Sequence, residues 1–332
     1  MCAAYPIYTK LKERSCNIVM STNVIASKEL TSKTSWKHDF LMNWRLYLLA
    51  LPVVLYFLIF NYLPMGGLIM AFQDYTPTKG IFSSEWVGFK NFIDFFTAPN
   101  FLQILRNTFV ISLLSLVIAF PLTIVFALLV NEITSNVFKR TVQTISYLPY
   151  FIPVVVVCGL IIDFVSSTGA ITNILVSLGL ERQNLLLNPK YFWWINLASE
   201  IWQGLGYGSI IYIAAITNVN PELYEAAYMD GANRFKRMWH ITIPGIMPTI
   251  IVMLILRCGL IMTVGFDKIL LLYNPNIYAT ADVISTYVVR MGIERMQYGY
   301  ATAVGLFNSI VGTALFLGSN ALARKYTESS IM

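Results

Sequence analysis

A single basic residue in the middle of an apolar run is the side chain with the clearest chemical meaning. Arg257 lies in the segment Gly245–Gly265, which is otherwise rich in Ile, Leu, Val and Met. An ionisable group in hydrocarbon is costly and usually faces a cavity or a partner. Its planar guanidinium matches a carboxylate through two parallel hydrogen bonds. Arg257 is therefore predicted either to bind an acidic solute or to form an ion pair with Asp163 or Glu200.

Uncharged polar side chains in other apolar runs could line the same path. Tyrosine rings stack, and hydroxyl and amide groups exchange hydrogen bonds with a polar solute. Most membrane tyrosines only pack or anchor, so both interpretations stay open. The candidate path residues besides Arg257 are Gln203, Tyr207, Tyr212 and Asn308.

The sequence shows no pattern for catalysis, for a cofactor or for a metal. Its two histidines are His38 and His240, and it has no HExxH, nucleophile elbow or GxxxxGK[ST] phosphate loop. The four cysteines, at positions 2, 16, 158 and 258, form no CxxC pair. We therefore expect no catalytic, cofactor-binding or metal-binding residues, and no ATP hydrolysis by this chain itself.

The composition predicts an all-α polytopic membrane protein. Hydrophobic residues make up 57% of the chain and charged residues 12%, against about 25% charged residues in soluble domains. A hydrocarbon core of about 30 Å needs about 20 apolar residues, and Pro149 and Pro153 interrupt one such run early. The six predicted membrane spans are Tyr47–Phe72, Asn107–Val130, Val142–Val165, Tyr191–Thr217, Gly245–Gly265 and Ala301–Leu322.

The placement of basic residues predicts the orientation. Segments 73–106, 166–190 and 266–300 form one face and carry fewer Lys and Arg than the other loops and tails. The positive-inside rule then puts both termini and the loop 218–244 in the cytoplasm. The net charge of +6 follows this asymmetry, so no nucleic-acid partner is expected. The domain prediction is a tail over 1–44, a membrane domain over 45–322 and a tail over 323–332.

The segment Asn218–Pro248 is the most polar interruption in the second half of the chain. Asn220 is a good N-cap, and a proline follows it where the first helical turn has no amide to lose. Gly231 stands where a left-handed residue would end this short helix, and a second helix would begin at Asn233. The segment predicts a compact helix-turn-helix on the membrane surface, shaped as a plug for a partner protein.

This segment also resembles the EAA loop of ABC-importer permeases, whose pattern is EAAxxDGA followed, with nine residues between the glycine and the isoleucine, by I-x-L-P. Here Ile243 takes the place of the usual Leu. In that family the loop is a coupling helix that docks into a cleft of the ATP-binding subunit. An ordinary interfacial helix is the alternative. The resemblance assigns the coupling role to Tyr224, Glu225, Ala226, Ala227, Asp230, Gly231, Ala232, Arg234 and Phe235.

Other stretches resemble oligosaccharide-importer permeases of the LplB branch of the MalF-like group. They lie at 62–67, 71–75, 86–92, 264–268, 272–275, 281–287 and 299–305. The resemblance implies a type I importer fold in the cytoplasmic membrane, in a heterodimer with a second permease. It also implies two copies of an ATPase and an extracytoplasmic solute-binding protein as partners.

The predicted function is import of oligosaccharides, and Arg257 suggests an acidic cargo that carries uronates, of the alginate or pectin type. The family pattern has an uncharged residue there, commonly Asn. One alternative is an ABC permease for a neutral oligosaccharide or another small solute. A second is an ion-coupled secondary transporter, which often has paired carboxylates within its spans.

Overall fold

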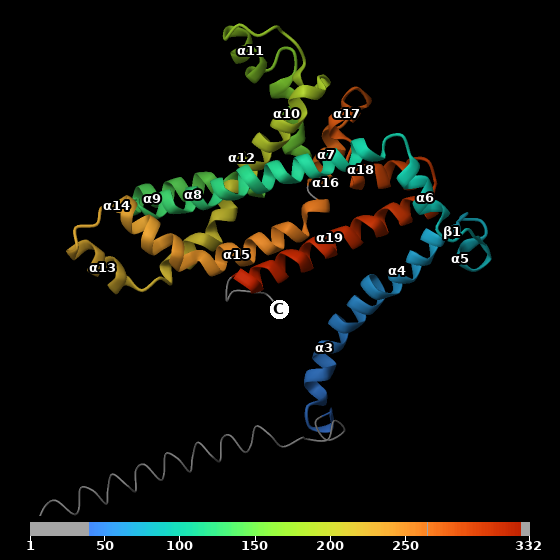
Figure 1. Cartoon of the computed structure of the whole chain (residues 1–332), viewed down its shortest axis with the longest axis horizontal. Coiled ribbons are helices and arrows are strands. Elements are labelled where there is room, and N and C mark those ends of the chain that lie inside the picture. The colour runs from blue at the N-terminus through green and yellow to red at the C-terminus, as the bar shows by residue number, and fades with distance from the viewer. Residues whose placement is uncertain (1–39, 264, 327–332) are drawn as a thin grey trace, which may run out of the picture. The chain divides into compact units, whose positions relative to one another are not determined.

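The computed structural model describes residues 40–263 and 265–326, and most of these are helical (Figure 1). They belong to two units that divide at Gly66. Most of the predicted tail over residues 1–44 lies outside the described residues. The first unit holds α3 (Trp44–Phe57), a π turn (Leu58–Tyr62) and α4 (Leu63–Met65). Within this unit, every described side chain in these three elements is at least partly exposed.

Five stretches in the described residues are long and apolar enough to cross a membrane. The prediction of a polytopic helical protein is therefore confirmed, with different boundaries. The remaining predicted span, Tyr191–Thr217, corresponds to α12 (Pro189–Thr217), whose 29 residues reach about 43 Å at 1.5 Å per residue. The five stretches are Trp44–Phe72, Phe101–Asn131, Val154–Ser177, Arg234–Gly259 and Tyr298–Lys325.

Three long helices contain a π turn two residues ahead of a proline. These turns are Leu58–Tyr62, Ser115–Ala119 and Met238–Thr242, and the prolines are at 64, 121 and 244. A proline lacks its own N–H and its ring clashes with the carbonyl group four residues earlier. A π turn moves that carbonyl group aside, because its hydrogen bonds reach five residues instead of four. The helices therefore continue past these prolines.

This effect corrects the predicted fifth span. Its helix does not begin at Gly245 but runs from Arg234 through α14 (Arg234–Arg237) and the π turn into α15 (Ile243–Gly259). It ends before Gly265, which has φ +67° and precedes α16 (Phe266–Leu272). The last span also extends beyond its predicted ends, as α19 (Tyr298–Tyr326).

The predicted third span is divided into two helices. α9 (Asn136–Tyr147) begins six residues before the predicted start, so Lys139 and Arg140 lie in a helix and not in a loop. A short 3-10 turn, Leu148–Phe151, follows, and α10 (Val154–Val165) begins after Pro153. The early break that the prolines predicted is therefore confirmed. α10 has 12 residues, or about 18 Å of helix, and leads through a turn to α11 (Ala170–Ser177).

α12 is the helix around which the second unit is packed. It contacts α8 (Phe120–Asn131), α9 and α15, while α15 packs along α19 (Figure 1). Gly206 lets α12 approach α9, because a Cβ atom there would lie 2.1 Å from the carbonyl oxygen of Ser146. At one end of these helices, Leu128, Ile216 and Ile246 form a buried cluster that joins α8, α12 and α15.

The segment before α7 (Phe101–Leu114) contains a small antiparallel β ladder of β1 (Gln73–Asp74) and β2 (Glu85–Trp86), with Gln73 opposite Trp86. It also contains α5 (Gly80–Ser83) and α6 (Lys90–Thr97).

The segment before α19 was predicted only as a connection on the face with fewer basic residues, and it is folded and partly buried. It forms α16, α17 (Tyr278–Ala281) and α18 (Ile284–Val289). Inside it, Arg290 forms a bidentate ion pair with Asp282, and both side chains are almost completely buried. Burial raises the pKa of the Asp282 carboxyl group, and the hydrogen bonds from Arg290 oppose this shift.

Candidate functional site

The loop 218–244 begins with the predicted capped helix. α13 (Pro221–Met229) has Asn220 as N-cap, and the Asn220 side chain accepts a hydrogen bond of 3.0 Å from the backbone N–H of Glu222. Pro221 occupies the first helical position, where its missing N–H leaves no donor unpaired. The local sequence therefore sets the start of this helix.

The Asp-Gly-Ala sequence ends α13 in a Schellman motif. Gly231 has φ +72°, and its N–H donates to the carbonyl of Tyr228 at 3.0 Å. The N–H of Ala232 donates to the carbonyl of Ala227 at 2.9 Å. These two hydrogen bonds satisfy carbonyl groups that a helix end leaves unpaired. The Schellman motif therefore explains why a glycine stands four residues after Ala227, at the position that needs a left-handed backbone.

The next helix starts as predicted, at Asn233. Its side chain accepts a hydrogen bond of 2.9 Å from the N–H of Lys236 and so caps α14. The prediction of a separate second helix is wrong, because α14 continues through the π turn into α15. The loop is thus one short helix, α13, joined by a four-residue turn to a long membrane helix.

Most of the predicted coupling residues lie on the exposed side of this loop. Tyr224, Ala227 and Ala232 are only partly exposed. The Tyr224 hydroxyl donates a hydrogen bond of 3.0 Å to the hydroxyl oxygen of Thr242. The exposed members are Glu225, Ala226, Asp230, Gly231, Arg234 and Phe235.

The structure gives Arg257 a partner, and that partner is Glu200 of α12. The distance from Arg257 Nη1 to Glu200 Oε1 is 3.4 Å, and 45% of the Arg257 side chain is exposed. Of the two partners that the sequence offered, Glu200 is confirmed and Asp163 is not. The same carboxylate oxygen accepts a hydrogen bond of 2.5 Å from Ser115 Oγ, so Glu200 joins three helical segments.

A second cation lies close to this carboxylate and was missed in the sequence. Lys268 was counted among the charges of an external loop, but it is 9% exposed and donates a hydrogen bond of 3.2 Å to Ser199 Oγ. Burial lowers the pKa of the Lys268 amine, while the Glu200 carboxylate and Cys158 act in the opposite direction. The apolar run 269–272 that follows Lys268 was the sequence feature that could have indicated its burial.

Arg257 and Asn308 line one cavity, which lies between α15 and α19. Its volume is about 660 Å³, and its other polar side chains include Thr263, Ser309 and Thr313. Asn308 is 8% exposed, and its Oδ1 atom has no hydrogen-bond partner among the described residues. An unpaired buried carbonyl oxygen could accept a hydrogen bond from a hydroxyl group.

The other predicted path residues are on α12 and differ in their surroundings. The ring of Tyr207 stacks on Tyr150 with 3.7 Å between centroids, and both rings are partly exposed. Gln203 Nε2 donates to the carbonyl of Ile152 at 3.4 Å. Tyr212 does not fit its predicted role, because it is 2% exposed and its ring packs against Phe120.

Comparison with known proteins decides the family. Residues 119–328 match the family described as binding-protein-dependent transport system inner membrane component. This chain belongs to that family of ABC-importer permeases. It is 44% identical to the protein LplB of Bacillus subtilis over 92% of this chain and 95% of LplB. It is 45% identical to the B. subtilis polygalacturonan/rhamnogalacturonan transport system permease protein YteP, over 86% and 89% of the two chains.

Solved structures agree with this assignment. One is a bacterial ABC transporter involved in the import of the acidic polysaccharide alginate, with a TM-score of 0.82 and 45% identity. The match covers 88% of this permease and 99% of that chain. Another is a bacterial alginate ABC transporter in complex with an alginate pentasaccharide-bound periplasmic protein, with a TM-score of 0.83 and 44% identity over 90% and 99% of the chains. The permease therefore has the predicted type I importer fold.

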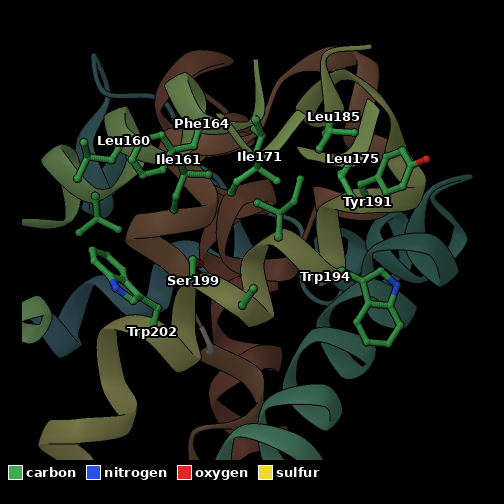
Figure 2. Close-up of a pocket in the computed structure, with 14 residues that line it drawn as sticks. Leu160, Ile161, Phe164, Ile171, Leu175, Leu185, Tyr191, Trp194, Ser199 and Trp202 are labelled. Carbon is green, nitrogen blue, oxygen red and sulfur yellow. The ribbon is translucent and has the colours of Figure 1, made fainter. Parts of the chain in front are cut away.

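A separate cavity of the permease is almost entirely apolar. Its volume is about 480 Å³, and it lies between α10, α11 and α12, where Leu160, Phe164 and Trp202 are among its lining residues (Figure 2). Trp194 of α12 also lines it. Trp193 instead donates a hydrogen bond of 2.8 Å from Nε1 to the carbonyl of Thr280. Trp193 thus holds α12 to α17.

Proposed function

We propose that this permease carries acidic oligosaccharides through an ATP-driven importer in the cytoplasmic membrane. The observation that carries the proposal is its 45% identity and TM-score of 0.82 to the alginate importer chain, over 88% of its length. YteP, whose name refers to polygalacturonan and rhamnogalacturonan, is equally similar. An acidic cargo also agrees with the charges around Glu200, where two cations, Arg257 and Lys268, face one carboxylate.

The proposed assembly has two permeases, two ATPase subunits and an extracytoplasmic solute-binding protein. Both termini and α13 would then face the cytoplasm, in agreement with the placement of Lys and Arg. Exposed residues of α13, of its turn and of the start of α14 would enter a cleft of the ATPase, among them Glu225, Asp230 and Phe235. ATP would be bound and hydrolysed by the partner subunits, and their closure would move the helices of the permease.

Arg257 would contribute to cargo selection although it has a partner. Its contact with Glu200 is 3.4 Å long and is not bidentate, and nearly half of the side chain is exposed. The guanidinium group has five N–H donors, so one contact leaves others for a carboxylate of the cargo. Asn308 lines the same cavity and could accept a hydrogen bond from a sugar hydroxyl group.

The test is transport by the reconstituted assembly with its loaded binding protein. Arg257→Asn should reduce uptake of a uronate oligosaccharide by roughly 10- to 150-fold relative to a neutral one, because one charge-assisted hydrogen bond is worth about 1.5–3 kcal/mol. Arg295→Asn is the matched control, since Arg295 is exposed and lies outside the cavity. An equal loss for acidic and neutral cargo would assign Arg257 to the ion pair alone.

A neutral cargo is the second candidate, because the Glu200 carboxylate already offsets one of the two cations. A panel of acidic and neutral oligosaccharides, each presented on a binding protein, separates the two. Stimulation of ATP hydrolysis by neutral oligosaccharides alone would exclude the acidic cargo. Transport by the chain without an ATPase, driven by an ion gradient, would overturn the proposed mechanism.

A further inference from the structure

The short helix α13 is joined to the membrane helices by few contacts. In the described part of the chain it packs against no other helix over more than a few residues. Figure 1 shows it at the end of the helices, connected to α14 by the turn after Met229. Most of its side chains are exposed, including Leu223 and Met229. A helix with so little packing needs specific links if it is to transmit force to the membrane spans.

Two tyrosines one helical turn apart supply such links, and they face the same long helix. The hydroxyl group of Tyr224 donates to Thr242 Oγ1 at 3.0 Å. The guanidinium carbon of Arg237 lies 5.8 Å from the ring centroid of Tyr228. Residues four apart lie on one face of a helix. This face of α13 therefore points to the helix formed by α14, the π turn and α15.

Thr242 is well placed to receive force. It is 2% exposed and is the last residue of the π turn ahead of Pro244. One turn further, Ile246 is fully buried in the cluster that contains Leu128 of α8 and Ile216 of α12. A displacement of Thr242 would therefore act one helical turn away from the point where α8, α12 and α15 pack together. The π turn and proline interrupt the regular helix there, so this position can bend.

We propose that Tyr224 is a positioning residue, whose hydrogen bond to Thr242 makes α13 and α15 move as one body. This assignment replaces a direct contact of its hydroxyl group with the ATPase. It rests on the proposed function, because it requires that α13 receives force from an ATPase. Without the hydrogen bond, α13 could tilt in the cleft of the ATPase while α15 stays in place.

The experiment compares variants of the complete reconstituted importer in three measurements. These are ATPase retention during purification, ATP hydrolysis, and oligosaccharide transported per ATP. Tyr224→Phe and Thr242→Val remove the two hydroxyl groups with little change of shape. Tyr228→Phe is the matched control, because it keeps the aromatic ring that faces Arg237. Amide hydrogen exchange of α13 in the same complexes measures the link without reference to transport.

We expect Tyr224→Phe to keep ATPase retention and to lower transport per ATP about fivefold, the factor that corresponds to one neutral hydrogen bond. Thr242→Val should have the same effect, and the double variant no greater one. Exchange of α13 amides should rise in both variants and stay unchanged in Tyr228→Phe. Loss of ATPase retention in Tyr224→Phe, additive effects in the double variant, or unchanged exchange would each overturn the inference. If the unaltered chain retains no ATPase, the proposed function itself is wrong.

Discussion

Gly231 offers the sharpest test of how the coupling loop is built. Its φ of +72° lies in the left-handed region, which residues with a Cβ atom avoid. A Cβ atom added there would meet nothing within 4 Å, so Gly231→Ala changes the backbone preference without a clash. The substitution therefore isolates the conformational cost of the turn after α13.

The expected cost follows from the backbone alone. A left-handed residue other than glycine is less stable by about 1–2 kcal/mol, which corresponds to a factor of about 5–30 in the population of the open turn. The hydrogen bonds lost on opening are those from Gly231 to Tyr228 and from Ala232 to Ala227. Protection of the Ala232 amide against hydrogen exchange should fall by the same factor.

The assay is hydrogen exchange measured by mass spectrometry on peptides that contain Ala232, together with transport per ATP. Gly231→Asn is the matched variant, because Asn tolerates the left-handed region and should lose much less protection. Gly305→Ala serves as the second control, since that glycine has ordinary backbone angles and also has open space at its Cβ position. Unchanged protection in Gly231→Ala, or equal loss in Gly231→Asn, would refute this account of the loop.

Two further predictions concern the packing of the spans and of the segment before α19. Gly206→Ala should lower the stability of the permease by about 1–3 kcal/mol, because the new methyl group would lie 2.1 Å from the carbonyl oxygen of Ser146. Gly204→Ala, which meets nothing within 4 Å, should leave the unfolding temperature in detergent unchanged, and an equal effect of both substitutions would contradict this packing. Asp282→Ala should cost about 3–5 kcal/mol by leaving a buried Arg290 unpaired. The double variant Asp282→Ala/Arg290→Met should recover part of that loss in the same measurement, and no recovery would argue against the ion pair.

Local features of the chain were predictable from the sequence, because each depends on a few neighbouring residues. The cap at Asn220, the left-handed Gly231 and the new start at Asn233 follow from side chains and backbone preferences within one turn. The apolar runs likewise predicted the membrane helices, since the bilayer sets their length. The family followed from the long motif in the same loop, and the comparison confirmed it.

Features that depend on three-dimensional packing were decided only by the tertiary structure. The sequence offered Asp163 and Glu200 as possible partners of Arg257, and helix packing brought Glu200 close enough for an ion pair. Packing also buried Lys268, which the sequence analysis had only counted among the charges of the segment 266–300. Pro244 shows the same limit, since a π turn carries the helix past it and a proline by itself signals a helix start. Contacts between residues distant in the chain set these outcomes, and no local pattern encodes them.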